Sequence, residues 1–408
     1  MAVSQQRTGP PSAPARPTRW AGLDGIRGVA VALVVLVHSG NSLWPGAQTW
    51  LCQGGPLGVH LFFVLSGFLI TTVLLDEADR RGRIDLWSFA GRRARRLVPA
   101  LVVLLGALVV LAALRPRVPL KLAASSAVYV LSFTANWQIN GHDLPLVQRV
   151  LGPRGMETEV LHTWSLAIEV QFYVMWATAL WFAVRRGWSL RRIATLTAAV
   201  VAGIIVARVV AYERGEDWLR IYFSTWSRLD APLIGALAAM AVRAGWLARR
   251  ERALTVAGGL GLAAFVAVAF LTDWSLPALP LGLYAGLAAC GALAVAAVVV
   301  APGTGFARSL SWRPLVALGT ISYSLYLWHY PIFWTIERRD PAWPGPVRLV
   351  FGIALALAAS TASYVLVERR FLRRSGARRR ASSQGEGSHE PAPWAQEARI
   401  EPASTPTT

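Results

Sequence analysis

Apolar residues in this 408-residue chain are grouped into ten long runs separated by short polar segments. Each run has about 17–23 residues, enough to cross about 30 Å of hydrocarbon as a helix. The pattern predicts an all-α integral membrane protein, a bundle of about ten transmembrane helices. The predicted spans lie within residues 23–42, 57–75, 97–114, 163–184, 193–212, 227–243, 253–271, 280–300, 314–336 and 347–368.

The charges between the runs predict which side of the membrane each loop faces. Basic segments at 76–96, 185–192, 243–252 and 308–313 fall on alternate loops, as expected for cytoplasmic loops. We therefore expect a multi-pass protein of the cell membrane with both its N- and C-termini in the cytoplasm.

Residues 120–136 are moderately apolar, and a crossing there would move every later basic loop to the outside. We expect the segment 115–162 to be external, with 120–136 re-entrant or lying at the interface. A chain of eleven spans is the alternative.

Composition agrees with a membrane protein. Hydrophobic residues make up 54% of the chain and charged residues only 15%, whereas soluble proteins have about 25% charged residues. The net charge of +19 comes largely from Arg residues between apolar runs, so we attribute it to cytoplasmic loops and expect no nucleic-acid partner. The only two cysteines, Cys52 and Cys290, make neither a disulfide framework nor a metal site.

The polar ends of the chain set the predicted domain limits. We expect residues 1–19 to be a disordered cytoplasmic segment, 20–370 to form one membrane domain, and 371–408 to be a disordered cytoplasmic tail.

Ionisable residues inside the predicted spans are candidates for function because burying them in lipid is costly. In the first run, Arg27 and His38 are eleven residues apart, close to three helical turns, and so share one face. His38 is a candidate general base because imidazole changes its charge near neutral pH. The alternatives are a structural hydrogen bond for His38 and snorkelling for Arg27. Asp24 lies one turn before Arg27.

A carboxylate and two further arginines are the next candidates. Glu169 lies about two turns inside the fourth run, where it needs a partner or a proton, so it either polarises a histidine or acts as the base itself. Ser165 and Tyr173 share its helical stripe. Arg93 and Arg96 are one turn apart at the inner surface, where they either anchor the helix or donate to phosphate.

Polar residues also lie in the sixth and ninth runs. Arg228 and Asp230 are near the outer end of the sixth run, either as an interfacial ion pair or as substrate contacts. Tyr326 and His329 share a face of the ninth run, where a structural role is equally open. Ser66 in the second run fits helix packing better than a nucleophile.

Helix depth separates these candidates into two groups. Counted along the helices, His38 lies about 22 Å from the inner face and Glu169 about 9 Å from the outer face. We therefore predict a cationic group near the inner leaflet and a histidine–carboxylate group in the outer half. Since no second nucleophile stands out, the pattern favours direct transfer of a group over a covalent enzyme intermediate.

Five motifs together resemble acyltransferase family 3, the membrane-bound O-acyltransferases of bacterial glycans and macrolide-type metabolites. They are LDGIRGVAVALVVLVHS, GVHLFFVLSGFLIT, RARRLVPA, HTWSLAIEVQFY and ISYSLYLWHYPI, and the resemblance covers roughly residues 20–370. The Arg-ten residues-His signature of the family falls on Arg27 and His38, and its Arg-x-x-Arg on Arg93 and Arg96. Its Trp-Ser-Leu…Glu…Phe-Tyr element includes Ser165, Glu169 and Tyr173.

The resemblance implies transfer of an acyl group, expected to be acetyl, from acyl-CoA to a hydroxyl of a sugar-containing acceptor. Acyl-CoA is then a co-substrate, with no bound cofactor, and the lipid bilayer is the other partner. The alternative function is a transporter or flippase that uses the buried polar residues as a proton relay. We assign His38 and Glu169 as catalytic, Arg27, Arg93 and Arg96 as donor-binding, and Asp24, Ser165, Tyr173, Arg228, Asp230, Tyr326 and His329 as substrate-binding. The acyl chain, the acceptor and the oligomeric state stay open.

Overall fold

The computed structural model describes residues 20–44, 54, 57–114, 120–140, 159–272, 276, 279–339 and 342–372. Within these ranges every regular element is a helix and no strand occurs. The predicted segment 1–19 and nearly all of the predicted tail lie outside the described residues, although the last helical stretch extends to Leu372.

Eight helical stretches in the described part of the chain are long and apolar enough to cross a membrane. They confirm the predicted all-α membrane bundle but not its count of about ten. The stretches are α1 (Ala21–Leu43), α2 (Leu57–Arg81), α3 (Leu86–Ala113), η2 with α7 (Leu161–Thr163 and Trp164–Arg185), α8 (Leu190–Glu213), η3 with α12 (Ala248–Arg250 and Glu251–Leu271), η4 with α13 (Leu279–Leu283 and Tyr284–Val300), and α17 with η5 (Gly345–Ser363 and Tyr364–Glu368).

The other two predicted spans are short or interrupted. The sixth becomes α11 (Asp230–Arg243), whose 14 residues extend about 21 Å, preceded by the short helices α9 (Trp218–Phe223) and α10 (Thr225–Arg228). The ninth divides into α15 (Arg313–Thr320) and α16 (Ser322–Arg339), and α14 (Gly305–Leu310) comes before them. A continuous apolar run therefore does not guarantee a continuous helix here.

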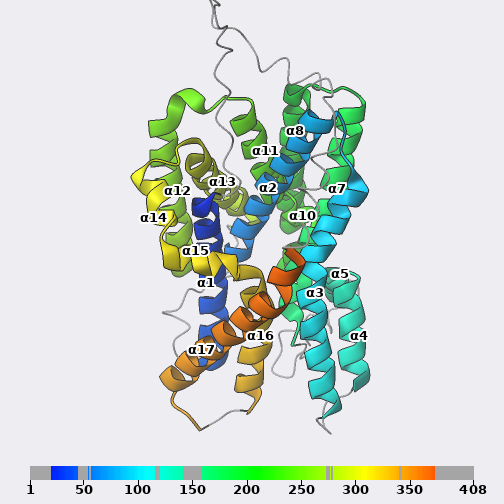
Figure 1. The fold of residues 1–408 in the computed structure, drawn as a ribbon, viewed down its shortest axis with the longest axis vertical. Coiled ribbons are helices and arrows are strands. Elements are labelled where there is room, and N and C mark those ends of the chain that lie inside the picture. Colours follow the sequence, from blue (N-terminus) through cyan, green and yellow to red (C-terminus); the bar gives the residue numbers. More distant parts are fainter. Residues whose placement is uncertain are drawn as a thin grey trace, which may run out of the picture.

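Residues 120–136 fold into α4 (Leu120–Leu131) and the first part of α5 (Ala135–Asn140). The 12 residues of α4 extend about 18 Å, less than the hydrocarbon thickness. The helix packs along α3 (Figure 1), and α5 contacts α7 and α9. Its length is that of a helix which does not cross completely, and the side of the membrane it faces stays a prediction.

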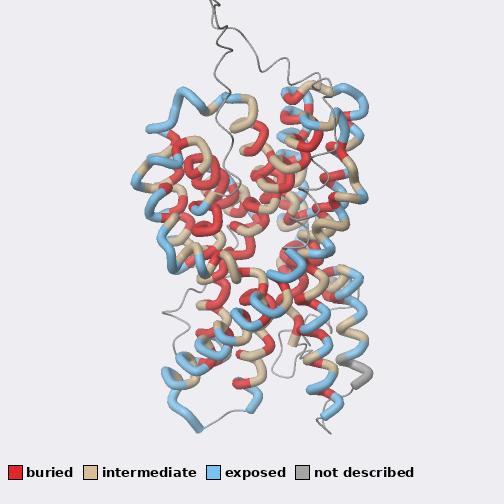
Figure 2. The backbone as a smooth tube through the Cα atoms, in the orientation of Figure 1, coloured by how far each residue is buried: buried red, intermediate tan, exposed pale blue. Residues whose placement is uncertain are grey.

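Helices α1 and α2 form the centre of the bundle. In the apolar 18-residue stretch of α2, 72% of the residues are buried inside the protein. The corresponding share in the stretch of α17 and η5, at the periphery, is 22%. Helix α1 contacts α2, α13, α15, α16 and α17. Figure 2 shows the same division, with buried residues facing inward and exposed residues on the outer surfaces. Polar residues on α1 and α2 are therefore held among packed helices.

Glycines allow α2 and α11 to cross at backbone contact. A Cβ atom added to Gly67 would lie 1.7 Å from the carbonyl oxygen of Pro232, and one added to Gly235 would lie 2.0 Å from that of Val64. Small residues at such crossings let membrane helices approach closely. The crossing fixes the rotation of α2 and so the direction in which the neighbouring Ser66 points.

Candidate active site

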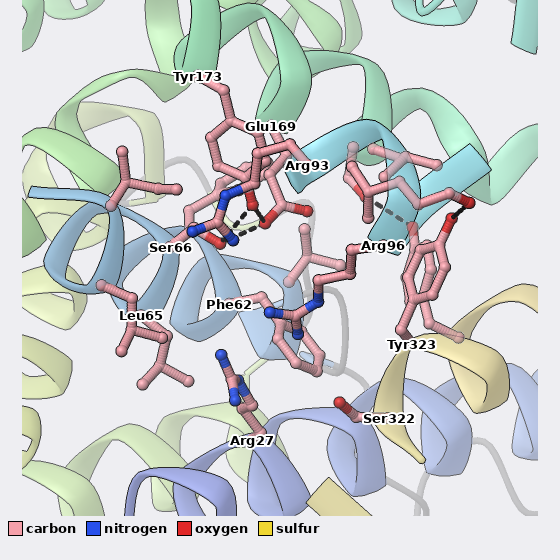
Figure 3. A pocket seen from close by; sticks show the side chains of 18 residues that line it. Arg27, Phe62, Leu65, Ser66, Arg93, Arg96, Glu169, Tyr173, Ser322 and Tyr323 are labelled. Atoms are coloured by element: carbon pink, nitrogen blue, oxygen red, sulfur yellow. Dashed lines mark hydrogen bonds between the residues drawn. The ribbon is translucent and has the colours of Figure 1, made fainter. Parts of the chain in front are cut away.

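A cavity lies between α1, α2, α3, α7 and α16. Figure 3 shows its lining side chains. Seven of the twelve predicted site residues line this cavity. They are Arg27, Arg93, Arg96, Ser165, Glu169, Tyr173 and Tyr326.

Three guanidinium groups converge on this cavity from two helices (Figure 3). Arg93 and Arg96 are one turn apart on α3 and so face the same way. Arg27 comes from α1, where its Nη1 donates to Asp24 Oδ1 at 2.9 Å. The Arg93 guanidinium lies over the Phe89 and Tyr173 rings, 5.5 Å from each centroid. The arrangement presents several N–H donors to an anionic group entering the cavity.

Glu169 faces the arginines from α7. Its Oε1 accepts hydrogen bonds from both the Ser66 hydroxyl and the Tyr173 hydroxyl, and the two hydroxyl oxygens are 3.3 Å apart. The dashed lines in Figure 3 mark this group next to Arg93. A carboxylate held by two hydroxyl donors is a partnered group, as burial in a membrane domain requires. Its partners are hydroxyls, not a histidine.

A second polar cluster contains His38, His329 and His162. His329 Nδ1 lies 2.9 Å from the backbone oxygen of Leu325. Because a carbonyl can only accept, Nδ1 carries the hydrogen, and Nε2 of neutral His329 is an acceptor. This Nε2 is 3.0 Å from His38 Nδ1, so His38 donates through Nδ1 and its own Nε2 is left unprotonated. The pairing gives His38 the tautomer of a proton acceptor.

His162 completes this cluster. Its ring stacks on Tyr330, with centroids 5.0 Å apart, and lies 5.6 Å from the His329 ring. Only 3% of the residue is exposed, and neither ring nitrogen has a hydrogen-bond partner in the described chain. Although three histidines meet here, no group of three described His, Cys, Asp or Glu side chains is arranged to hold a metal ion.

Tyr326 lies between the cavity and the histidines. Its ring lines the cavity and is 5.8 Å from the His329 ring. Its hydroxyl donates to the backbone oxygen of His162 and is 2.6 Å from Ser165 Oγ. Because the Tyr326 hydroxyl already donates its hydrogen to that carbonyl, the Ser165 hydroxyl is the donor in its hydrogen bond with the Tyr326 hydroxyl oxygen. His38 does not line the cavity, so in this conformation a side-chain layer separates it from the arginines.

The structure corrects two predicted pairings. Sequence reasoning allowed Glu169 to hold a histidine, but Glu169 accepts from hydroxyls and His38 pairs with His329. It also allowed an ion pair between Arg228 and Asp230, but Asp230 Oδ2 is 2.7 Å from Arg208 Nη1. Neither Arg228 nor Asp230 lines the cavity.

Sequence reasoning gave no role to three residues that the structure places in or near buried polar groups. Arg208 lies inside the apolar run of α8 and is fully buried, and the rule that an intramembrane charge signals function would have selected it. His162 comes two residues before Trp164, in the same motif as Ser165 and Glu169. Tyr323, which lines the cavity, donates to the Leu97 backbone oxygen at 2.7 Å, a contact that sequence does not indicate.

Comparison with known proteins places the chain among acyltransferases. A family model described as an acyltransferase domain matches residues 20–365. The chain is 33% identical to YrhL of Bacillus subtilis over 76% of its own length and 48% of the relative. It is 31% identical to the O-acetyltransferase OatA of Staphylococcus aureus, covering 85% of this chain and 56% of the relative. It is 29% identical to the peptidoglycan O-acetyltransferase OatA of Listeria monocytogenes, covering 85% and 54%.

The chain thus spans about half the length of the curated relatives it matches. No solved structure matches it.

Proposed function

Because the chain belongs to the acyltransferase family whose domain model covers residues 20–365, we propose that it is a multi-pass membrane O-acyltransferase. It moves an acyl group, in the simplest case acetyl, from acyl-CoA to a hydroxyl of a sugar-containing acceptor. The supporting observations are a cavity where three arginines converge and, next to its Tyr326 wall, the pair of His329 with His38, whose second ring nitrogen is unprotonated. The names of the OatA relatives favour acetyl as the acyl group, and that of the Listeria relative favours a glycan of the cell wall as acceptor.

Acyl-CoA suits the arginine cavity because its phosphates are anionic and its pantetheine arm is long and thin. In this proposal Arg27, Arg93 and Arg96 hold phosphate or polarise the thioester by charge-assisted hydrogen bonds. The apolar part of the lining, including Phe62 and Leu65, accommodates the arm. Three arginines against the carboxylates of Asp24 and Glu169 leave the cavity with a net positive charge for an anionic donor.

His38 is the proposed general base. The acceptor hydroxyl gives its proton to His38 Nε2 as its oxygen attacks the thioester carbonyl carbon. The carbon–sulfur bond then breaks, and CoA leaves as the thiolate, which takes the proton from His38 Nε2 and restores the neutral imidazole. His329 stabilises the transient imidazolium because its Nε2 accepts from His38 Nδ1, and the bond to the Leu325 backbone oxygen fixes its tautomer. Direct transfer needs no acyl-enzyme.

The thioester and His38 meet only if the layer containing Tyr326 and Ser165 moves. Two hydrogen bonds hold the Tyr326 hydroxyl, and a rotation of this ring connects the cavity to the histidine cluster. Glu169 in this scheme keeps Ser66 and Tyr173 in place at the cavity wall and is the alternative proton acceptor.

We further propose that both termini are cytoplasmic. The support is the alternation of basic loops along the sequence. Donor and acceptor then approach from opposite faces of the membrane, with the arginines toward the cytoplasm.

The test is release of free CoA thiol by the purified protein with acetyl-CoA and a cell-wall glycan acceptor, together with mass spectrometry of the acceptor. We expect acceptor-dependent thiol release in the wild type and a loss of at least 100-fold in His38→Ala, with an unchanged elution profile showing that the variant is folded. Wild-type rates in His38→Ala would remove His38 from the chemistry. Movement of the glycan across liposomes without acylation would instead support a flippase.

A further inference from the structure

A buried cation outside the cavity has no described partner for its N–H groups. Arg228, in α10, is 0% exposed. Its Nε, Nη1 and Nη2 have no hydrogen-bond partner in the part of the chain that the structure describes. The guanidinium lies over the Tyr284 and Tyr222 rings, 4.2 and 4.9 Å from their centroids. Cation–π contacts stabilise its faces but bring no negative charge to its N–H edge.

A second buried arginine is next to the same tyrosine. Arg208 is also 0% exposed, and its guanidinium is 5.5 Å from the Tyr284 centroid. It donates to Asp230 Oδ2 at 2.7 Å and to the backbone oxygens of Ser227 and Pro280 at 2.6 and 3.1 Å. Its Nη2 has no partner among the described residues. Two buried guanidinium charges therefore stand against one carboxylate, Asp230, which in the described chain pairs with Arg208 alone, and each guanidinium keeps unused donors.

Two buried arginines and one buried carboxylate leave one positive charge without a counter-charge from the described residues at this place in the membrane domain. Arginine does not release its proton under ordinary conditions, and an unpaired buried charge costs far more than an unpaired polar group. Water molecules would satisfy the N–H donors but would not neutralise the charge. An anion would do both, since guanidinium donors form strong charge-assisted hydrogen bonds.

The packing limits the size of that anion. Arg208, Arg228 and Asp230 are all at 0% exposure, so a sugar or nucleotide has no access in this conformation. His60 closes another side of the Tyr284 ring at 5.4 Å. Its Nε2 donates to the Tyr284 backbone oxygen at 2.6 Å, so in neutral His60 the Nδ1 atom carries no hydrogen. This Nδ1 has no hydrogen-bond partner within the described ranges and, with only a lone pair, cannot donate to an anion. The free N–H groups of Arg208 and Arg228 therefore decide that the site binds an anion.

We propose that Arg228 and Arg208 together bind one small monoanion of halide size, such as chloride, at the junction of α8, α10, α11 and η4. This site is separate from the acyl-transfer cavity, whose lining includes none of these residues. By neutralising the junction, the anion stabilises the start of α11, the helix whose Pro232 contacts Gly67 of α2. Anion binding would thus stabilise the helix crossing that positions the cavity wall.

The experiment compares the unfolding temperature of the purified protein in sodium chloride and in sodium gluconate at equal ionic strength. Chloride should raise Tm with the logarithm of its concentration above Kd, on the order of 2–4 °C at about 100 times Kd, whereas gluconate, a large anion, should not. Bromide and nitrate should act like chloride. Arg228→Gln should abolish the chloride response. Arg220→Gln should keep it, because Arg220 lies at the protein surface with its side chain 43% exposed.

Equal unfolding temperatures in chloride and gluconate would overturn the proposal. A rise with sodium acetate or inorganic phosphate but not with chloride would also overturn it, and would indicate a site for an acidic group of the acceptor. If Arg228→Gln does not fold, chloride-35 NMR line broadening of the wild type, reversed by bromide, tests the site directly, and no excess broadening would count against it. These measurements need neither acyl-CoA nor acceptor, so they succeed or fail independently of the proposed acyl transfer.

Discussion

The crossing of α2 and α11 offers a sharp test of how the candidate active site is held. In Gly67→Ala the new methyl carbon would lie 1.7 Å from the Pro232 oxygen, with the carbonyl carbon at 2.5 Å. Both atoms belong to backbone, so no side-chain rotation relieves the overlap. The helices must separate by roughly 1.5 Å to restore an ordinary carbon–oxygen contact, more than a close-packed interface yields easily.

The expected loss of stability follows from two opposing terms. Overpacking of this kind costs about 1–3 kcal/mol, and the size of the overlap places Gly67→Ala near the upper end. Replacing glycine by alanine within a helix returns about 1 kcal/mol. The net destabilisation is therefore about 2 kcal/mol, which lowers Tm by roughly 3 °C in a domain of this size. Because Ser66 is adjacent, its hydrogen bond to Glu169 should be disturbed as well, lowering acyl transfer.

A matched control separates the overlap from the change of residue type. Gly203 lies in α8, where an added Cβ would meet no atom within 4 Å. Gly203→Ala should leave Tm unchanged or slightly higher and should not affect activity. Thermal unfolding followed by tryptophan fluorescence in one detergent measures both variants. A Tm for Gly67→Ala equal to or above that of Gly203→Ala would refute the close crossing of α2 and α11.

Three further predictions concern the donor, the cap of α3 and the topology. Arg93→Ala and Arg96→Ala should each raise the KM for acyl-CoA at least tenfold, since a hydrogen bond to a charged group contributes about 1.5–3 kcal/mol, whereas Arg92→Ala, outside the lining, should not. The backbone N–H and the hydroxyl of Ser88 donate to the Asp85 carboxylate and keep the pKa of this carboxyl below its usual range. The stabilisation by ionised Asp85 is therefore complete above the pKa of the unfolded state and is lost as pH falls through the lower pKa of the folded state. Asp85→Ala should lower stability by about 1 kcal/mol at neutral pH, with a difference from wild type that narrows in acid titrations. A cysteine at Asn140, with the native cysteines replaced, should label from outside in intact cells, and protection would favour eleven spans.

The sequence predicted the helical segments well because apolar runs have a direct physical cause. A chain in hydrocarbon must satisfy its backbone hydrogen bonds internally, so long apolar runs become helices. The segments α1, α2 and α8 follow their predicted spans closely. The count of about ten is not confirmed, since α11 has only 14 residues and the ninth run is divided between α15 and α16.

The side-chain partners could be predicted only where they are local. Helical spacing placed Arg93 and Arg96 on one face, and they line one cavity. It also placed Tyr173 one turn from Glu169, and they hydrogen-bond. The partner of His38 comes from a residue 291 positions away, and its identity depends on the rotation of α16 against α1, which no spacing rule gives.

The relative position of the cavity and the histidine cluster has a mechanistic consequence. In the proposed mechanism, a permanently open path would let water reach the thioester and hydrolyse it, whereas a closed layer would keep the thioester away from His38 until an acceptor is present. Tyr326 has the contacts of such a layer, because its ring lines the cavity while its hydroxyl bonds to the turn that carries His162. An acceptor that contacts His162 from the outside would compete for that turn and release the tyrosine. Binding of the acceptor and access of the thioester to His38 would then be one event, which is the coupling that transfer to a glycan rather than to water requires.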